Sequence, residues 1–414
     1  MENINENIGE NIDENIAENK NISEKGLYIV FGAFMVIVSI VIRYLGMEFI
    51  SSDYNLFLKH WYSDIKELGG LSALSQQVGD YNVTYQIVIA LFTYLDVFPL
   101  YLIKIFSIVF DYSLAVAAMF FAGEGKTGNK LYKFRALAVI AVVLIPTVFF
   151  NSAYWGQCDV IYVSFIVWAL YFLRKDKFTA AFIFLGLSFA FKLQVVFILP
   201  FIVYYCWYKK KTELVKLLLI PAVGFVMSLP AVFMGRPWYT FISVYLDQSD
   251  SYKLMTMNAP NTWAIYICSY DKMKIPAILI TFALLGIVLL LVMLKKIKID
   301  NTRIFAGLAA WSAYTCVLFL PSMHERYFYI VDILMLLLAL VAPKRYLIWF
   351  IAEELLSLCA TYLRCMLFIP FDLKMLACIN MAIYIAFTVV LALDIIKNNK
   401  GLPEEPETVQ AQLE

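Results

Sequence analysis

Runs of apolar residues, each about 17 to 25 residues long, recur along almost the whole chain and constrain its fold more than any other feature. Three of them are 27–47, 100–122 and 274–294. A helix of this length crosses a hydrocarbon core of roughly 30 Å. Because no water is present there to satisfy backbone groups, repeated crossings of this kind are helical. The sequence therefore predicts an all-α fold, a polytopic transmembrane helical bundle.

The charged residues are few, and their positions matter more than their sum. They make up 16% of the 414 residues and the net charge is +1, so bulk charge gives no reason to expect a nucleic-acid partner. The positive-inside rule places clusters of lysine and arginine on the cytoplasmic face. Six such clusters lie between the apolar runs, at 123–135, 174–177, 208–216, 295–303, 343–345 and 397–400.

The chain must cross the membrane an even number of times between any two of these clusters. Counting on this basis predicts about 12 spans, with a thirteenth left open, and both termini in the cytoplasm. The segment 178–208 is apolar enough for one long helix, but a single crossing would place two basic clusters on opposite faces. We therefore expect a break at 191–194, which leaves two short spans of about 14 residues each.

Residues 48–99 are expected to lie outside, between the first two spans. Phe57, Trp61, Ile65 and Leu68 form a stripe with the spacing i, i+4, i+8, i+11, which is typical of an amphipathic helix. Such a helix lies along the membrane surface with its aromatic side chains in the headgroup region. The next apolar run, 82–95, is too short to span the membrane and is predicted to be interfacial or re-entrant.

The two ends of the chain differ from its middle. Residues 1–26 repeat Glu-Asn-Ile every four residues and are predicted to be a cytoplasmic tail, disordered or nascently helical. The first apolar run lacks a short hydrophobic core followed by a cleavage site, so we expect a retained anchor. Residues 27–397 form one transmembrane domain, and 398–414 a second cytoplasmic tail. The seven cysteines are scattered singly, as small apolar side chains among helices are.

Five polar groups remain once the basic clusters are set aside, and all fall at the outer boundary of the predicted spans. Ionisable residues in or beside a membrane are costly and indicate functional sites by default. The occurrence of these groups on one face is therefore more informative than any single group. They are SSDY (51–54), YWGQCD (154–159), FKLQ (191–194), NAPN (258–261) and MHER (323–326).

Two acids in these groups each have a catalytic and a structural interpretation. Asp53 follows the first span, where a carboxylate at a partly dry interface suits a general base. The structural alternatives are an N-cap of the amphipathic helix and a solvated loop acid. Asp159 begins an apolar run, so that its carboxylate either faces a cavity or partner, or caps the helix together with Gln157. The sequence leaves both choices open.

Three potential cations, Lys192, His324 and Arg326, meet the same test. Cations at the outer boundary suit the binding of a phosphate, which arginine holds through paired donors. The structural alternatives are snorkelling of Lys192, a lipid-headgroup contact, and an ion pair with Glu325. The chain has no Walker A motif, no GxGxxG after a strand and no soluble segment for a Rossmann domain. A phosphate-bearing substrate is therefore expected to arrive through the membrane, as an isoprenoid-phosphate lipid.

The order of these motifs resembles the GT-C superfamily of integral-membrane glycosyltransferases, and most of all its mannosyltransferase-like branch. The motifs are SDY after the first span, WGQCD at a later one, then FKLQ, NAPN and MHERYFY. The likeness covers residues 27–370, and WGQ-x-D and HER-Y are its most specific parts. It implies a GT-C-type bundle and a catalytic domain at 27–397.

The resemblance also implies a reaction: transfer of a hexose, mannose or glucose, from a polyprenyl-phosphate donor to a hydroxyl of a glycan, glycolipid or protein acceptor. The transfer takes place on the outer face of the cell membrane. By carry-over, Asp53 is the general base and Asp159 organises the acceptor or donor. Lys192, His324 and Arg326 hold the donor phosphate. Supporting roles fall to Tyr54, Gln157, Gln194 and Glu325.

The sequence departs from the family at one place. Many GT-C enzymes carry two acids as D-x-D, whereas this chain has Asp53-Tyr54-Asn55. Metal dependence is therefore open, and a divalent cation shared by Asp53 and Asp159 stays an alternative.

Two other classes of function compete with the transferase. A lipid or oligosaccharide flippase or transporter of the cell-envelope polysaccharide pathway would place its site near the bilayer midplane, on helices related by inverted repeats. The sequence shows no such repeat, and only Lys192 is expected near the midplane. A non-catalytic scaffold in a polysaccharide-assembly complex would need no acid at Asp53.

Overall fold

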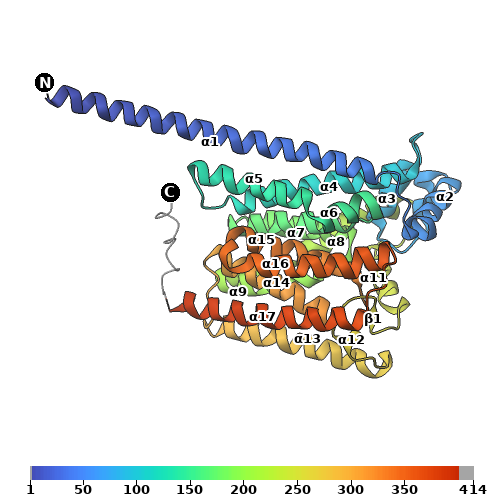
Figure 1. The fold of residues 1–414 in the computed structure, drawn as a ribbon. Coiled ribbons are helices and arrows are strands. Elements are labelled where there is room, and N and C mark those ends of the chain that lie inside the picture. Colours follow the sequence, from blue (N-terminus) through green and yellow to red (C-terminus); the bar gives the residue numbers. More distant parts are fainter. Residues whose placement is uncertain (1, 401–414) are drawn as a thin grey trace.

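The structure is a computed structural model that describes residues 2–400, with the backbone alone for 2–23 and 249–251. The long helices lie side by side along one direction of the molecule, and the short elements α2, α11, α12 and β1 gather at one end (Figure 1). We call this end the loop end and the opposite one the basic end. Residues 401–414 of the predicted C-terminal tail lie outside the described part.

The elements fall into three groups. The helices of the bundle are α1 (Glu2–Gly46), α4 (Pro99–Ala122), α5 (Gly128–Leu144), α6 (Pro146–Phe149), α7 (Asp159–Arg174), α8 (Phe178–Phe191), α9 (Leu199–Lys210), α10 (Leu219–Phe233), α13 (Tyr270–Met293), α14 (Thr302–Phe319), α15 (Tyr329–Val341), α16 (Pro343–Ser357) and α17 (Leu373–Asn399). Helical turns of 3₁₀ or π type are η1 (Tyr54–Leu58), η2 (Gly70–Ser75), η3 (Phe150–Trp155), η4 (Leu193–Ile198), η5 (Lys211–Leu218), η6 (Glu325–Phe328) and η7 (Leu358–Met366). The short elements are α2 (Lys59–Glu67), α3 (Val83–Phe92), α11 (Thr240–Ser251), α12 (Thr262–Ile265) and the parallel strands β1 (Thr256–Met257) and β2 (Met323–His324).

Several helices are long and apolar enough to cross a membrane. Seven in the described part meet this condition, and an eighth does if α5 and the segment 146–155, bent by 49°, form one span. The chain is therefore an all-α, multi-pass membrane bundle, as predicted. A count of twelve is not reached by length and hydropathy, because some expected spans are short helices, such as α8 with 14 residues.

The predicted break at 191–194 is confirmed. Helix α8 ends at Phe191, Lys192 has an extended backbone (φ −147°, ψ 139°), and η4 begins at Leu193. The ammonium group of Lys192 is held by an acid of α7, so the break keeps the charge inside the protein. A second irregularity follows at Lys210, whose backbone is not helical (φ −164°, ψ 89°).

The predicted helix after Asp53 is present as η1 and α2, and another stripe of it packs against the protein. The buried residues are Tyr54, Leu58, Tyr62 and Ile65, of which only Ile65 belongs to the expected stripe. Phe57 and Leu68 are exposed instead. The run 82–95 forms the ten-residue helix α3, about 15 Å long and too short to span a membrane.

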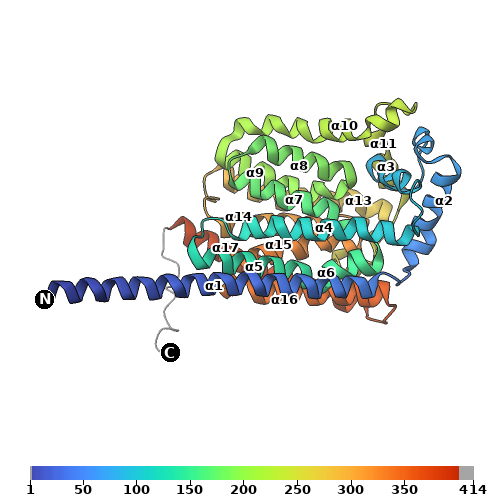
Figure 2. The ribbon, with the colours of Figure 1, turned by 90° about the horizontal axis from the view of Figure 1, so that it is seen from above.

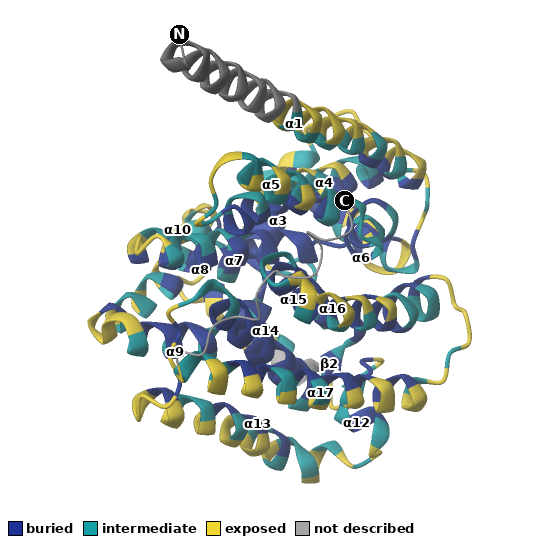
Figure 3. Cartoon of the chain, turned by 60° about the vertical axis from the view of Figure 1, so that its left-hand side comes forward, coloured by how far each residue is buried: buried dark blue, intermediate teal, exposed yellow. Residues whose placement is uncertain are grey.

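Burial divides the bundle into a centre and a margin. Helix α14 is the centre, with 83% of its most apolar window buried, whereas α1 has only 6%. Figure 3 shows α14 surrounded by other helices and α1 at the edge. From above, α1 crosses one side of the bundle and runs beyond it (Figure 2). Helix α1 begins at Glu2, so the residues predicted to form the N-terminal tail, disordered or nascently helical, have a helical backbone.

Two buried cations attach α1 to its neighbours near the loop end. Arg43 Nε lies 2.8 Å from Asp111 Oδ2 on α4, and the two side chains are 2% and 0% exposed. The same oxygen accepts a hydrogen bond from Ser152 Oγ of η3. Lys104 Nζ donates to the carbonyls of Gly46 (2.8 Å) and Phe49 (2.6 Å). These bonds fix the end of α1 from which the chain continues to Asp53.

Candidate functional site

The polar segments predicted to share one face lie together at the loop end. Strands β1 and β2 pair Thr256 with Met323 and Met257 with His324. Asn258 forms a further bridge with His324, so the NAPN segment adjoins the MHER segment. The other three segments meet through side chains.

Asp53 is the acid of this region that solvent can reach. Its Oδ2 accepts hydrogen bonds from Gln157 Nε2 (2.5 Å) and Arg326 Nη1 (2.6 Å). Its side chain remains 20% exposed. The Asp53 side chain makes no capping bond. The N–H of Tyr54 donates instead to Ser51 Oγ at 3.2 Å. The structure therefore excludes the N-cap interpretation of Asp53, and the bonds to Gln157 and Arg326 distinguish its carboxylate from a solvated loop acid.

Asp159 is fully buried and paired. Its Oδ1 lies 2.5 Å from Lys192 Nζ, and its Oδ2 accepts a hydrogen bond from Asn151 Nδ2 at 3.1 Å. The side chains of Asp159 and Lys192 are 0% and 7% exposed. As first residue of α7, the carboxylate also stands at the favourable end of the helix dipole. It makes no capping bond with Gln157, and Lys192 does not snorkel.

A tyrosine and a glutamine connect the two ion pairs. Tyr81 Oη donates to Gln157 Oε1 at 2.9 Å, and Gln157 donates to Asp53. Lys192 Nζ lies 5.4 Å from the centre of the Tyr81 ring, close enough for a cation–π contact. Tyr81 and Asn151 were not predicted as site residues. No local pattern separates Tyr81 from the other tyrosines of the chain.

Two N–H donors near Asp53 have no acceptor among the described residues. They are Arg326 Nε and Trp155 Nε1, both buried. The two side chains are neighbours, since Arg326 Cζ lies 5.8 Å from the Trp155 ring. A buried donor without a partner is costly, so an oxygen-rich ligand would be stabilised here.

The remaining residues of the MHER segment carry less charge than the sequence implied. Burial, with the positive charges of Arg326 and Lys192, lowers the pKa of His324 to about 3. Burial also raises the pKa of Glu325, whose Oε2 lies 3.9 Å from His324 Nδ1. His324 is therefore neutral at pH 7 and offers a hydrogen bond rather than the cationic charge that was predicted.

Two residues predicted to support the site lie beside it rather than in the network. Tyr54 is buried, and its ring packs edge-on against Phe98 at 6.4 Å. Gln194 bonds to Tyr327, and its Oε1 has no hydrogen-bond donor in the described part of the chain. Neither contacts Asp53 or Asp159 through a hydrogen bond.

The two acids considered as a shared metal site face cations instead. Asp53 lies against Arg326 and Asp159 against Lys192. Among the described side chains, no group of three or more His, Cys, Asp or Glu is arranged to hold a metal ion. The residues present do not fit a divalent cation at this site.

A buried acid at the junction of three helices was not predicted. Glu353 of α16 is 0% exposed, and its Oε2 lies 2.5 Å from the hydroxyl of Tyr314 on α14. That hydroxyl also contacts Asn380 Oδ1 on α17. Asn380 in turn donates from Nδ2 to the carbonyl of Pro260 at 2.8 Å. The chain of contacts therefore leads from Glu353 to the NAPN segment. An acid pair inside an apolar run, Glu353-Glu354, was the available signal.

A scan against protein-family models and a search of curated proteins find no match to this chain. The case for a function therefore depends on the geometry of the site.

Proposed function

We propose that this chain is a GT-C-type membrane glycosyltransferase that moves a hexose, mannose or glucose, from a polyprenyl-phosphate donor to a hydroxyl acceptor. The observation that supports it most is the setting of Asp53: a partly exposed carboxylate that bonds to Arg326 and Gln157 beside a second, buried ion pair. A carboxylate suits the acceptor hydroxyl, and the cationic donors suit the departing phosphate.

In the proposed reaction, Asp53 removes the proton of the acceptor hydroxyl while the acceptor oxygen bonds to the anomeric carbon. The bond between that carbon and the phosphate oxygen breaks, and its electron pair leaves with the polyprenyl phosphate. The sugar passes through an oxocarbenium-like state, as in glycoside chemistry. Arg326 and Lys192 stabilise the charge that develops on the phosphate.

The contact between Arg326 and Asp53 gives this proposal an order of events. Arg326 Nη1 donates to Asp53 Oδ2 at 2.6 Å, so this carboxylate oxygen is already engaged before a substrate binds. A donor phosphate competes with Asp53 for the guanidinium group. Binding of the donor therefore frees Asp53 before the acceptor reacts.

Asp159, by contrast, is assigned a positioning role. Both of its oxygens are occupied and its side chain is fully buried. It holds Lys192 toward the site and does not touch substrate. His324 contributes a neutral hydrogen-bonding group.

The arrangement in the membrane is part of the proposal. With all basic clusters on the cytoplasmic side, the proposed topology has about 12 crossings and both termini in the cytoplasm. The loop end then lies on the outer face of the cell membrane. The acceptor is a glycan, a glycolipid or a protein.

The test is release of free polyprenyl phosphate. Purified protein in nanodiscs is supplied with radiolabelled polyprenyl-phosphate hexoses and a crude membrane acceptor. We expect Asp53→Asn to reduce release about 100-fold or more, since the loss of a general base has that effect. The matched control is Asp64→Asn, an exposed acid of α2 in the same loop.

A wild-type level of release by Asp53→Asn would overturn the assignment of the base. Movement of an intact lipid-linked sugar across the bilayer, with no lipid phosphate released from any donor, would instead indicate the flippase.

A further inference from the structure

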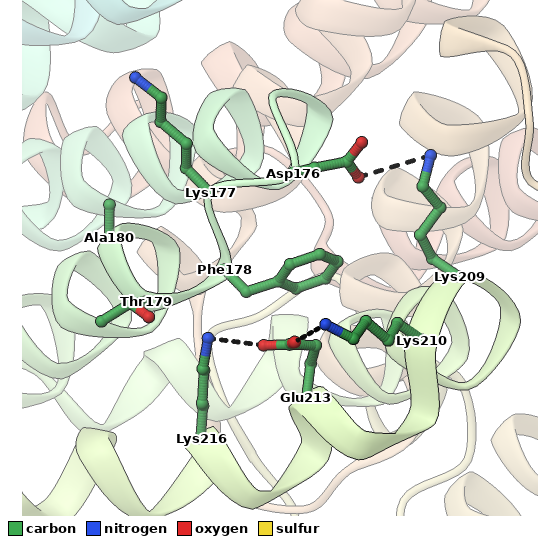
Figure 4. Close-up of a pocket in the computed structure, with 9 residues that line it drawn as sticks. All are labelled: Asp176, Lys177, Phe178, Thr179, Ala180, Lys209, Lys210, Glu213 and Lys216. Atoms are coloured by element: carbon green, nitrogen blue, oxygen red, sulfur yellow. Dashed lines mark ion pairs between the residues drawn. The ribbon is translucent and has the colours of Figure 1, made fainter.

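A pocket lies at the basic end, away from Asp53, where α7 turns into α8 and α9 continues into η5 (Figure 4). Its volume is about 730 Å³. Lysines predominate among the residues that line it. They are Asp176, Lys177, Phe178, Thr179, Ala180, Lys209, Lys210, Glu213 and Lys216.

The pocket carries an excess of positive charge. Four lysines against two acids leave a net charge of +2. Lys209 lies 3.4 Å from Asp176, and Glu213 is shared by Lys210 (2.8 Å) and Lys216 (2.6 Å). In Figure 4 these three lysines converge on the two acids, while the ammonium group of Lys177 points away from them. Lys177 has no ion partner in the described part of the chain.

The helical turn that supplies Lys216 also presents apolar side chains to the surroundings. In a 3₁₀ helix, residues three apart lie on the same edge. Glu213 and Lys216 therefore share one edge of η5, and Val215 and Leu218 share another. Val215 and Leu218 are 66% and 70% exposed. Exposed apolar side chains that adjoin one another in a membrane protein mark a surface for lipid or for another protein.

We propose that this pocket binds the phosphate headgroup of an anionic membrane lipid. The phosphate lies among Lys209, Lys210 and Lys216, where it competes with Asp176 for the first ammonium group and with Glu213 for the other two. The acyl chains lie along Val215 and Leu218. A soluble phosphate compound matches the charge of the pocket but leaves the apolar edge uncovered, so the lipid is the better fit.

The test is native mass spectrometry of the full-length protein, titrated in detergent with phosphatidylglycerol or phosphatidylcholine. We expect phosphatidylglycerol to bind more tightly than phosphatidylcholine. Lys209→Gln and Lys216→Gln should each weaken that binding about fivefold, the effect of one lysine near an anionic lipid surface. Glu213→Gln should tighten it, because it removes the competing carboxylate.

The opposite signs of these effects distinguish binding from damage to the fold, since a misfolded variant loses affinity in every case. Lys344→Gln is the matched control, an exposed lysine of another basic cluster. Equal binding of the two lipids, or weaker binding by Glu213→Gln, would overturn the proposal. Displacement of the lipid by glycerol phosphate at equal concentration would show a site for soluble phosphates instead.

Discussion

Asp53 and Asp159 carry the same functional group in different surroundings. Asp53 is 20% exposed and shares its bonds with Gln157 and Arg326. Asp159 is completely buried, and its nearest charge is Lys192. Asp53 can therefore exchange its hydrogen-bond partners for a substrate, whereas Asp159 keeps its bond with Lys192. The same contrast decides what a substitution at each position should do.

Lys192→Met leaves the carboxylate of Asp159 buried without a counter-ion. We expect the free energy of unfolding to fall by about 3–5 kcal/mol. Asp159→Asn in the same chain should restore much of the loss, because the amide stays bonded to Asn151 and carries no charge. Thermal unfolding of the three proteins in detergent measures both effects. If Lys192→Met alone were as stable as wild type, the ion pair between Asp159 and Lys192 would not be desolvated.

His324 should make stability depend on pH. Its folded pKa of about 3 lies below the ordinary value of 6.5, because burial and the cations nearby disfavour the charged form. Between those values the unfolded chain binds a proton that the folded chain does not, so stability falls as pH falls from about 6.5 to 3. Above about pH 6.5, His324 makes no further contribution to the dependence of stability on pH.

The measurement is unfolding at a series of pH values for wild type and His324→Gln. Between about pH 3 and 6.5, the free energy of unfolding should change less steeply with pH in the variant. The difference in slope corresponds to at most one bound proton, the contribution of His324. Identical slopes in the two proteins would contradict the shifted pKa.

The charged residues of the site were predictable, and their uncharged partners were not. Asp53, Asp159, Lys192 and Arg326 are conspicuous because charges in or beside apolar runs are costly. Tyr81 contacts Gln157 across 76 positions of sequence, and nothing local in the chain indicates such a contact.

At the scale of elements, a chain of hydrogen bonds connects Glu353 of α16, Tyr314 of α14 and Asn380 of α17. The donors and acceptors in this chain require that Glu353 carries a proton. The carbonyl of Pro260 can only accept, so Asn380 turns its amide toward it and its oxygen toward Tyr314. The single hydroxyl hydrogen of Tyr314 then goes to Asn380. Glu353 must donate the hydrogen of its own bond with Tyr314 and is therefore a neutral carboxylic acid.

Glu353→Gln should accordingly keep that bond and change the free energy of unfolding by less than about 1 kcal/mol. Glu353→Ala loses the donor and opens a cavity, and we expect a loss of about 2 kcal/mol or more. Denaturation of both variants in detergent compares them. If glutamine were as harmful as alanine, Glu353 would have to be ionised.

Elements themselves were predicted with unequal success. The break at 191–194 followed from the even number of crossings required between two basic clusters. The stripe of η1 and α2 that packs against the protein was not identified, because Tyr54, Leu58, Tyr62 and Ile65 have the same spacing as the stripe that was assigned to the membrane surface. Two apolar stripes fit one helix, and only packing against the neighbouring elements selects between them.

At the scale of the whole molecule, the proposed topology predicts which end faces the cell exterior. A single cysteine at Asp64, exposed on α2, should react with a membrane-impermeant maleimide in intact cells. One at Lys344, exposed at the start of α16, should react only after lysis. The seven native cysteines are free thiols and are first replaced. The reverse labelling pattern would invert the topology.

The number of spans shows where sequence reasoning ends for a chain like this. Seven described helices qualify by length and hydropathy, or eight with the bent pair. The count of about 12 depends on the charge clusters as well, because helices such as α8 are too short to qualify alone. It stays a prediction that the cysteine labelling above begins to test.

The buried bond between Arg43 and Asp111 has a consequence for biosynthesis. The two residues are 68 positions apart, so Arg43 reaches the membrane before its counter-ion has been translated. An arginine facing lipid is costly, and only 6% of the most apolar window of α1 is buried in the bundle. We expect α1 to remain at the insertion machinery until α4 emerges, and the two helices to enter the bilayer as a pair.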